Sequence, residues 1–315
     1  KMNEKILTLD EAPRSKYGKE LYDFRNVITH PLKWEDVELL LTESTFSMTD
    51  DLKNEVEEFW KKELEKRPTA FDAPKLRFEG VELDNGTLFV YVSDKIKYSQ
   101  HNVLRNKKGL PLMAYPTPTT IDNLQETIDG YLLFGERDTG ISDQSGGAVV
   151  GAGFHEFKQK KGITFYPGGI FDTALTEAHE ETEYMDIFGT AVKVAIKETE
   201  YVKPVKHPIE KRGIRAITFV RGSNTDVTLG FYFPLTVVSD QVDLNRNNKE
   251  FKRMLKIKNS ESNLELMLET GSLRGTESVE GVINSNIVLA DHPIGVLEAY
   301  RNMRGKGLIK VSYQH

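Results

Sequence analysis

Apolar residues recur at helical spacing over roughly the first 70 residues, in two segments. One segment runs from Trp34 to Leu41. The other runs from Asp50 to Arg67, and Thr49 or Asp50 can cap its amino end. The apolar residues of the second segment form one stripe that we expect to pack against a core, and they are Leu52, Val56, Phe59, Trp60 and Leu64. The sequence therefore predicts a helical start to the chain.

A period of two that begins at Lys75 predicts β-strands in the next part of the chain. Alternating apolar residues precede the turn Asp84-Asn85-Gly86, and the apolar run from Leu88 to Val92 follows it. Asparagine followed by glycine is typical of a tight β-hairpin, because both residues adopt positive φ at little cost. We therefore predict an N-terminal extension, residues 1–110, that contains helices and then a β-hairpin within residues 70–105.

Residues 111–315 are predicted to form a second unit in which strands and helices are mixed. The polar region from Asn245 to Ser278 is interpreted as a surface excursion with one helix, Lys249 to Lys256. Elsewhere the pattern predicts two helices, one that begins near Gly169 or Ile170 and one from Pro293 to Met303. It also predicts strands at Gly130 to Arg137, Gly146 to Phe154, Arg215 to Val220 and Val227 to Val238. This order indicates an α/β fold of the α+β kind.

Net charge limits the partners of the protein. The chain of 315 residues carries a formal net charge of −6, whereas a nucleic-acid polymer is bound by a concentrated basic surface. A small anionic ligand needs only a few local cations or a bound metal. We therefore expect no nucleic-acid polymer as a partner, and small nucleotides stay open.

The amino-acid content also bounds the chemistry and the compartment. The chain contains no cysteine, which excludes disulfides, thiolate zinc sites and cysteine nucleophiles. No apolar run approaches the roughly 20 residues of a membrane span, and residues 1–10 lack the apolar region of a signal peptide. We therefore expect a cytoplasmic protein with no membrane partner.

An acidic segment, Gly169 to Glu183, carries the strongest candidate chemistry. If it is one helix, Glu177, Glu180 and Glu181 stand at i, i+3 and i+4 and share one patch. Carboxylates at this spacing repel by about a few tenths of a kcal/mol per pair, so a divalent cation would stabilise them. Oxygen ligands alone favour Mg²⁺ or Mn²⁺ over zinc. A solvated acidic helix face is the other interpretation that this pattern leaves open.

Residues before the acidic segment could contact a ligand. Glycines, among them Gly151 and Gly153, let the backbone of the predicted strand approach a ligand closely. His155 follows this strand and could contact phosphate or transfer a proton. Arg137 ends the preceding strand, where its guanidinium could pair with phosphate or with a neighbouring acidic side chain. P-loop, dinucleotide-binding and serine-nucleophile motifs are absent from the sequence.

The segment Thr176 to Glu183, Thr-Glu-Ala-His-Glu-Glu-Thr-Glu, resembles part of the Nudix signature, Arg-Glu-aliphatic-x-Glu-Glu-x-Gly. All three glutamates of that signature are matched, whereas Thr176 replaces its arginine and Glu183 its last glycine. The resemblance to the Nudix hydrolase superfamily implies an α/β/α sandwich with a mixed sheet. The residues that it implies are Glu177, Glu180 and Glu181 as catalytic metal ligands and Gly151 or Gly153 as the upstream glycine.

A second resemblance extends over more of the chain. The segment Phe71 to Tyr98 is similar to the extension of Nudix hydrolases that act on UDP-glucose and UDP-galactose, and Asp291 to Tyr300 resembles their closing segment. The resemblance implies that Arg77 and Tyr98 contact the sugar or the base. It also implies a small-molecule nucleotide substrate and metal-dependent hydrolysis of a diphosphate linkage in a nucleoside diphosphate derivative, such as a UDP-sugar. The two departures from the signature leave a catalytically inactive Nudix-fold nucleotide-binding module as the alternative.

Overall fold

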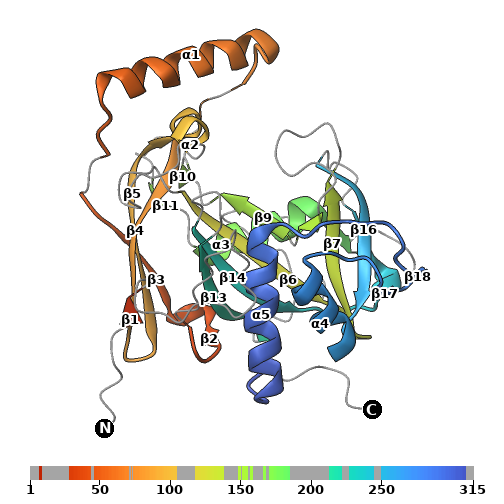
Figure 1. Cartoon of the computed structure of the whole chain (residues 1–315). Coiled ribbons are helices and arrows are strands. Elements are labelled where there is room, and N and C mark those ends of the chain that lie inside the picture. The colour runs from red at the N-terminus through yellow and green to blue at the C-terminus, as the bar shows by residue number, and fades with distance from the viewer. Residues whose placement is uncertain are drawn as a thin grey trace, which may run out of the picture.

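The computed structural model of the chain describes the larger part of the sequence in separate ranges. Among these residues the strands form a sheet of ten strands, a sheet of four strands and two short pairs (Figure 1). No helix among them is long and apolar enough to cross a membrane. The described residues are 7–8, 28–43, 46–70, 72, 74–104, 118–137, 148–149, 151–154, 157–158, 166–167, 170–184, 213–221, 227–244 and 250–309.

The larger sheet is built around β6 (Thr119–Glu126), which runs parallel to β14 (Val227–Pro234). Two other neighbours, β7 (Tyr131–Arg137) and β9 (Gly151–Phe154), are antiparallel to β6. A parallel pair among antiparallel pairs makes the sheet mixed. The outer strands are β8 (Ala148–Val149), β16 (Phe251–Lys258), β17 (Glu277–Ser278) and β18 (Gly281–Val282) on the side of β7, and β13 (Arg215–Arg221) and β2 (Leu32–Lys33) on the side of β14.

The glycine-containing segment fills the space where β6 and β7 separate. The described ladder between β6 and β7 joins Glu126 to Leu132, close to the turn that connects the strands. Farther from the turn, β8 pairs with β7 and β9 pairs with β6, so this segment lies between the two strands. The predicted glycine-rich strand is therefore confirmed, in the form of two short strands.

The smaller sheet contains the predicted hairpin, formed by β4 (Pro74–Asp84) and β5 (Thr87–Lys97). At its turn Asn85 has a φ of 48° and Gly86 a φ of 84°, the left-handed conformation that an Asn-Gly pair favours. β1 (Leu7–Thr8) pairs with β4, and β3 (Val37–Leu41) pairs with β5. The hairpin prediction is confirmed.

The segment from Trp34 to Leu41 is not the predicted helix. It forms a 3-10 turn, η1 (Trp34–Asp36), and then strand β3, which runs parallel to β5. The five residues of β3 are almost wholly apolar, and so short an apolar run has no period that separates a helix from a strand. Pairing with the edge of β5 makes this segment a strand.

The second predicted helix is confirmed as α1 (Asp50–Lys66), where the Thr49 side chain accepts a hydrogen bond from the Leu52 amide at 3.4 Å. α1 contacts α2 (Tyr98–Leu104), and Figure 1 shows both helices near one end of the hairpin. Val56 of the predicted apolar stripe is buried, whereas the other four residues are half-buried. Its partner α2 is short, so it covers less of the apolar stripe of α1 than a sheet would.

The hairpin packs directly against the larger sheet. The ring centres of Phe78 on β4 and Phe219 on β13 are 5.3 Å apart, and buried side chains of both sheets belong to one hydrophobic cluster. Arg77 also forms an isolated β-bridge with Pro118, just before β6. The boundary near residue 110 falls in residues 105–117, outside the described ranges, so the division into 1–110 and 111–315 stays a prediction.

Helices cover both faces of the larger sheet. α3 (Ile170–Glu181) packs on β9 and β6, whereas α5 (Asp291–Gly305) packs on β13, β6 and β14. Successive side chains of β6 point to opposite faces. Asn123 donates to the Ala174 carbonyl of α3, and Asp122 pairs with His292 of α5. A mixed sheet between two helix layers confirms the predicted α/β fold.

The surface helix predicted from Lys249 to Lys256 is wrong. These residues lie mostly in β16, which pairs with β7 inside the larger sheet, and the helix of this region is α4 (Glu261–Thr270), which packs against α5. A β-bulge at the start of β16 shifts its alternation. Its first apolar residues therefore have the helical spacing i, i+3 and i+4, and they are Phe251, Met254 and Leu255.

The helix predicted to reach Glu183 ends at Glu181, and the chain passes at once into β12 (Thr182–Tyr184). The predicted closing helix is confirmed as α5. The strands predicted at residues 130–137, 215–220 and 227–238 are confirmed as β7, β13 and a shorter β14. The other described elements are short, namely β15 (Val242–Leu244), which pairs with β12, the pair β10 (Phe157–Lys158) and β11 (Tyr166–Pro167), and the 3-10 turn η4 (Ser239–Gln241).

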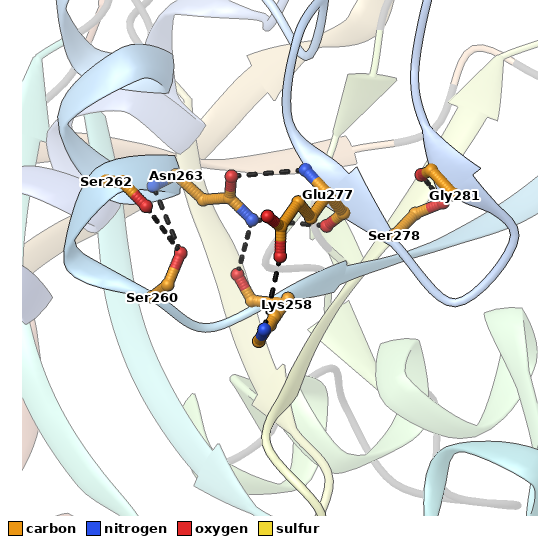
Figure 2. A network of polar contacts seen from close by, with 7 residues as sticks. All are labelled: Lys258, Ser260, Ser262, Asn263, Glu277, Ser278 and Gly281. Atoms are coloured by element: carbon orange, nitrogen blue, oxygen red, sulfur yellow. Dashed lines mark hydrogen bonds and ion pairs between the residues drawn. The ribbon is translucent and has the colours of Figure 1, made fainter.

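Asn263 fastens α4 to two strands. Its side-chain amide donates to the carbonyls of Lys258 at 2.8 Å and Glu277 at 3.1 Å and accepts from the Glu277 amide at 3.1 Å (Figure 2). Its own backbone amide donates to Ser260, the N-cap of α4, at 3.2 Å. Asn263 is 4% exposed, so three backbone groups depend on one buried side chain.

Asn263→Ala should lower the free energy of unfolding by about 2–4 kcal/mol, because buried backbone donors and acceptors would lose their partners. Ser262→Ala is the matched control, since the Ser262 hydroxyl contacts Ser260 at an exposed position and its loss should change little. Urea denaturation of both variants measures the difference. Equal stability of the two variants would contradict this role of Asn263.

A buried carboxylate, Glu126, joins β6 to α5 and to neighbouring strands. It is 2% exposed and accepts hydrogen bonds from the Tyr232 hydroxyl at 2.7 Å, the Tyr300 hydroxyl at 2.9 Å and the Asn259 amide. Burial raises the pKa of Glu126, whereas these hydrogen bonds and the charge of Arg304 oppose the rise. Donors from three parts of the chain therefore meet at one carboxylate.

Glu126→Gln should change the pH dependence of stability in a defined direction. Because the folded-state pKa of Glu126 lies above its ordinary value of 4.5, the folded protein holds this proton more tightly than the unfolded chain. The free energy of unfolding therefore falls as the pH rises from about 4.5 through the folded-state pKa, and the variant lacks this contribution. Urea unfolding over this range should show the parent losing stability relative to the variant. A constant difference would refute the expectation.

Candidate functional site

α3 is seated on the sheet by small and apolar side chains. Ala174 and Ala178 are fully buried, Leu175 is 7% exposed, and the helix packs on β9 and β6. Their spacing of i, i+1 and i+4 places them on one side of the helix. The predicted burial of Leu175 and Ala178 against the glycine-containing strand is confirmed.

Two of the three predicted glutamates have described side chains, and both lie on α3. Glu177 is half-buried, and Glu181, the last residue of the helix, is 7% exposed. They are four residues apart, which places them one turn from each other on the same side. The Glu180 side chain lies outside the described residues. Among the side chains that are described, no three His, Asp or Glu residues gather as a metal-binding group.

Two amide side chains of β6 hold α3 and the residues that follow it. Asn123 Nδ2 donates to the Ala174 carbonyl oxygen at 2.7 Å, and Gln125 Nε2 donates to the Thr182 hydroxyl at 3.2 Å. The Tyr184 hydroxyl donates to Gln125 Oε1 at 2.6 Å. The helix is therefore held on both sides of the segment that carries the two glutamates.

The Tyr184 hydroxyl is a neutral donor close to the acidic helix. Burial raises the pKa of this hydroxyl, a hydrogen bond with Thr182 opposes the rise, and the negative charge of Glu181 adds to it. The hydroxyl therefore stays protonated.

Sequence reasoning did not single out Asn123, Gln125 or Tyr184. The signal that could have found β6 is the Asp129-Gly130 pair, which lies at the start of the strand predicted from Gly130 to Arg137. Such a pair is typical of a hairpin turn, and Gly130 has a positive φ of 88°. A hairpin turn at this place requires an antiparallel partner strand before it in the sequence, and β6 is that strand.

Three other residues that were predicted to contact a ligand lie on strands of the larger sheet. Gly151 and Gly153 belong to β9, and Gly151 pairs with Asn123 of β6. Arg137 is the last residue of β7 and is half-buried. His155 lies outside the described residues. The structure thus brings the glycine backbone and α3 together beside the centre of the larger sheet.

Arg77 and Tyr98 lie on the hairpin and directly after it. Arg77 is 4% exposed, donates to Glu79 Oε1 at 2.8 Å and lies over the Phe46 ring, 5.1 Å from its centre. Ser93 donates to the same Glu79 oxygen at 2.6 Å. Tyr98 begins α2 and is half-buried. Glu79 therefore compensates the charge of Arg77 inside the extension, which itself reaches α3 through β3.

No protein-family model matches the chain, and no curated protein matches it. Two similar solved structures are of a bifunctional NMN adenylyltransferase/ADP ribose pyrophosphatase from Francisella tularensis. The one complexed with AMP and a manganese ion is 11% identical with a TM-score of 0.35 and covers 65% of this chain and 44% of that chain. The other is 12% identical with a TM-score of 0.35 and covers 63% and 43%. The chain therefore matches less than half of their length, and similarity at this level identifies neither family nor function.

Ala178→Leu should lower the free energy of unfolding by about 1–3 kcal/mol, because the longer side chain would push α3 away from β9 or force a strained rotamer. Ala178→Ser adds a single oxygen atom at the same position and should cost less. Thermal and urea unfolding measure both variants. Equal losses would show that the close approach of helix and strand is not the cause.

Proposed function

We propose that this protein hydrolyses a diphosphate linkage in a nucleoside diphosphate derivative with the help of Mg²⁺ or Mn²⁺. The observation that carries the proposal is the position of Glu177 and Glu181, one turn apart on a helix that packs on a glycine-containing strand. The Nudix signature, which residues 176–183 resemble, has metal-binding glutamates at these positions. The geometry of α3 and the resemblance of its sequence support the same function.

The carboxylates of α3 suit a hard divalent cation. Glu181 is buried and Glu177 is half-buried, so water hydrates their charges only in part. A cation beside a partly buried carboxylate interacts with its charge more strongly than it would in bulk water. Oxygen donors of this kind favour Mg²⁺ or Mn²⁺, and the residues that would hold the ion are Glu177, Glu180 and Glu181.

The residues of the chain would contribute position and charge. A metal held by the glutamates of α3 would neutralise the charge of a diphosphate and lower the pKa of a water that it binds. Glycine has no Cβ atom, so the glycines of β9 would let a phosphate approach the backbone. We assign contacts with phosphate to Arg137 and His155 and contacts with the sugar or the base to Arg77 and Tyr98. Hydrolysis would release a nucleoside monophosphate and a second phosphorylated product.

A nucleotide-binding module without turnover is the second candidate. Thr176 stands where the Nudix signature has arginine, and Glu183 stands where it has glycine. In addition, the charge of Arg77 is already compensated by Glu79. In this case the same residues would bind a nucleotide and a metal without lowering the barrier to hydrolysis.

A screen with added Mg²⁺ separates the two candidates. The compounds are nucleotide sugars, with UDP-sugars among them, dinucleotides and nucleoside triphosphates, and the readout is released monophosphate. We expect release from at least one diphosphate-linked compound and its loss after addition of EDTA. A protein that binds a nucleotide but is inert across the screen would be the binding module.

Replacing both Glu180 and Glu181 by Gln should abolish metal-dependent hydrolysis, because two of the three charged oxygen ligands are lost. The fold should stay intact or become slightly more stable, since the change relieves repulsion and barely alters side-chain volume. Rates under saturating Mg²⁺ and melting temperatures without metal are measured together.

The control neutralises two exposed glutamates of another helix, Glu261 and Glu265 of α4, which both pair with Arg301. This control should hydrolyse at the parental rate. Parental activity in the Glu180 and Glu181 double variant would show that the acidic helix is not the catalytic centre.

A further inference from the structure

The junction between α3 and β12 carries one of the proposed metal ligands. Glu181 is the last residue of the helix, and residues 182–184 pair at once with β15. The last turn of a helix lacks part of its hydrogen bonds and needs other groups to hold it. A metal ligand at this position therefore requires an anchor outside the helix.

Gln125 of β6 makes two contacts at this junction. Its Nε2 donates to the Thr182 hydroxyl at 3.2 Å, and its Oε1 accepts from the Tyr184 hydroxyl at 2.6 Å. Gln125 and Tyr184 are each 2% exposed and Thr182 is 4% exposed, so little water competes for these bonds. Both ends of one buried amide thus fix the residues that directly follow Glu181.

The contact with Tyr184 fixes the direction of its hydroxyl. A tyrosine hydroxyl has a single proton, and here it is donated to Gln125 Oε1. Residues around a metal ligand orient it, and their loss typically lowers metal affinity by about 10-fold to 100-fold. The anchored residues that follow Glu181 therefore bear on its orientation.

We propose that Gln125 is a positioning residue for Glu181, because it holds the helix-to-strand junction that follows this ligand. This role rests on the proposed metal site of α3 and identifies what orients one of its ligands. Asn123 supplies a second anchor at Ala174, on the other side of the glutamates. Both anchors belong to the central strand of the larger sheet, where the backbone is fixed by neighbours on each side.

The test uses Mn²⁺ alone, whose binding is followed by loss of the paramagnetic resonance signal of the free ion and needs no substrate. Gln125→Met preserves the shape of the side chain but removes both contacts, and it should weaken Mn²⁺ binding by about 10-fold or more. Tyr184→Phe removes only one of the two contacts of Gln125, so it should weaken binding less than Gln125→Met. The double variant of Gln125→Met and Tyr184→Phe should bind about as well as Gln125→Met, because Gln125→Met already removes the contact with Tyr184.

Gln125→Glu keeps an oxygen that can accept from Tyr184, so it should retain more Mn²⁺ affinity than Gln125→Met. This variant also decides the matter if the methionine variant does not fold. Glu126→Gln is the matched control, since it changes the next residue of β6 on the opposite face and should leave Mn²⁺ binding unchanged. Melting temperatures of all variants separate a loss of stability from a loss of affinity.

The outcomes distinguish this role from the proposed function. A parent that binds no Mn²⁺ would overturn the metal site and the positioning role together. Binding by the parent that is lost in Glu181→Gln but kept in Gln125→Met would overturn only the role of Gln125. A double variant that binds much more weakly than Gln125→Met, or equal losses in the Met and Glu variants, would overturn the part assigned to the contact between Gln125 and Tyr184.

Discussion

Polar side chains in the middle of the larger sheet must find hydrogen-bond partners in the layers above and below it, and this requirement ties the molecule together. β6 is almost wholly buried, yet four of its residues are polar and contact the helix layers. Asn123 and Gln125 reach α3 and the strand that follows it, whereas Asp122 and Glu126 reach α5. A buried polar group without a partner costs about 1–3 kcal/mol, so neither layer can slide over the sheet without a large loss.

On the α5 face, close packing and hydrogen bonding support each other. A Cβ atom at Gly230 would lie 2.7 Å from Val296 of α5 and 2.8 Å from Thr218, so glycine at this position lets the helix lie close to the sheet. His292 lies one turn before Val296 and reaches Asp122 on the adjacent strand at 2.6 Å. The packing at Gly230 sets the distance between α5 and the sheet that the contact between His292 and Asp122 needs. This contact in turn fixes the position of α5 along its own axis.

Elements with a local chemical signal could be predicted from the sequence, and elements defined by tertiary pairing could not. The hairpin has its Asn-Gly turn, α1 has its N-cap, and α3 has one apolar side and one acidic side. β6 was not predicted because the polar residues that fasten both helix layers break the apolar alternation of a strand. β16 was not predicted because its bulge gives its apolar residues a helical spacing.

The same difference separates the site residues. Glu177 and Glu181 share a helix, so their spacing predicts their proximity, whereas Gln125 and Tyr184 meet only through the folding of distant strands.

The carboxylates on the two faces of the larger sheet differ in their setting. Glu126 receives hydrogen bonds from three parts of the chain, which is what a carboxylate needs if it is buried for a structural reason. Glu177 and Glu181 share one helix with Glu180, at spacings where like charges repel. Such a group of like charges does not stabilise a fold whose central strand is already hydrogen-bonded to the layers on both sides. Repulsion of this kind is typical of functional sites. It is the physical reason to look for the ligand at α3 and not at α5.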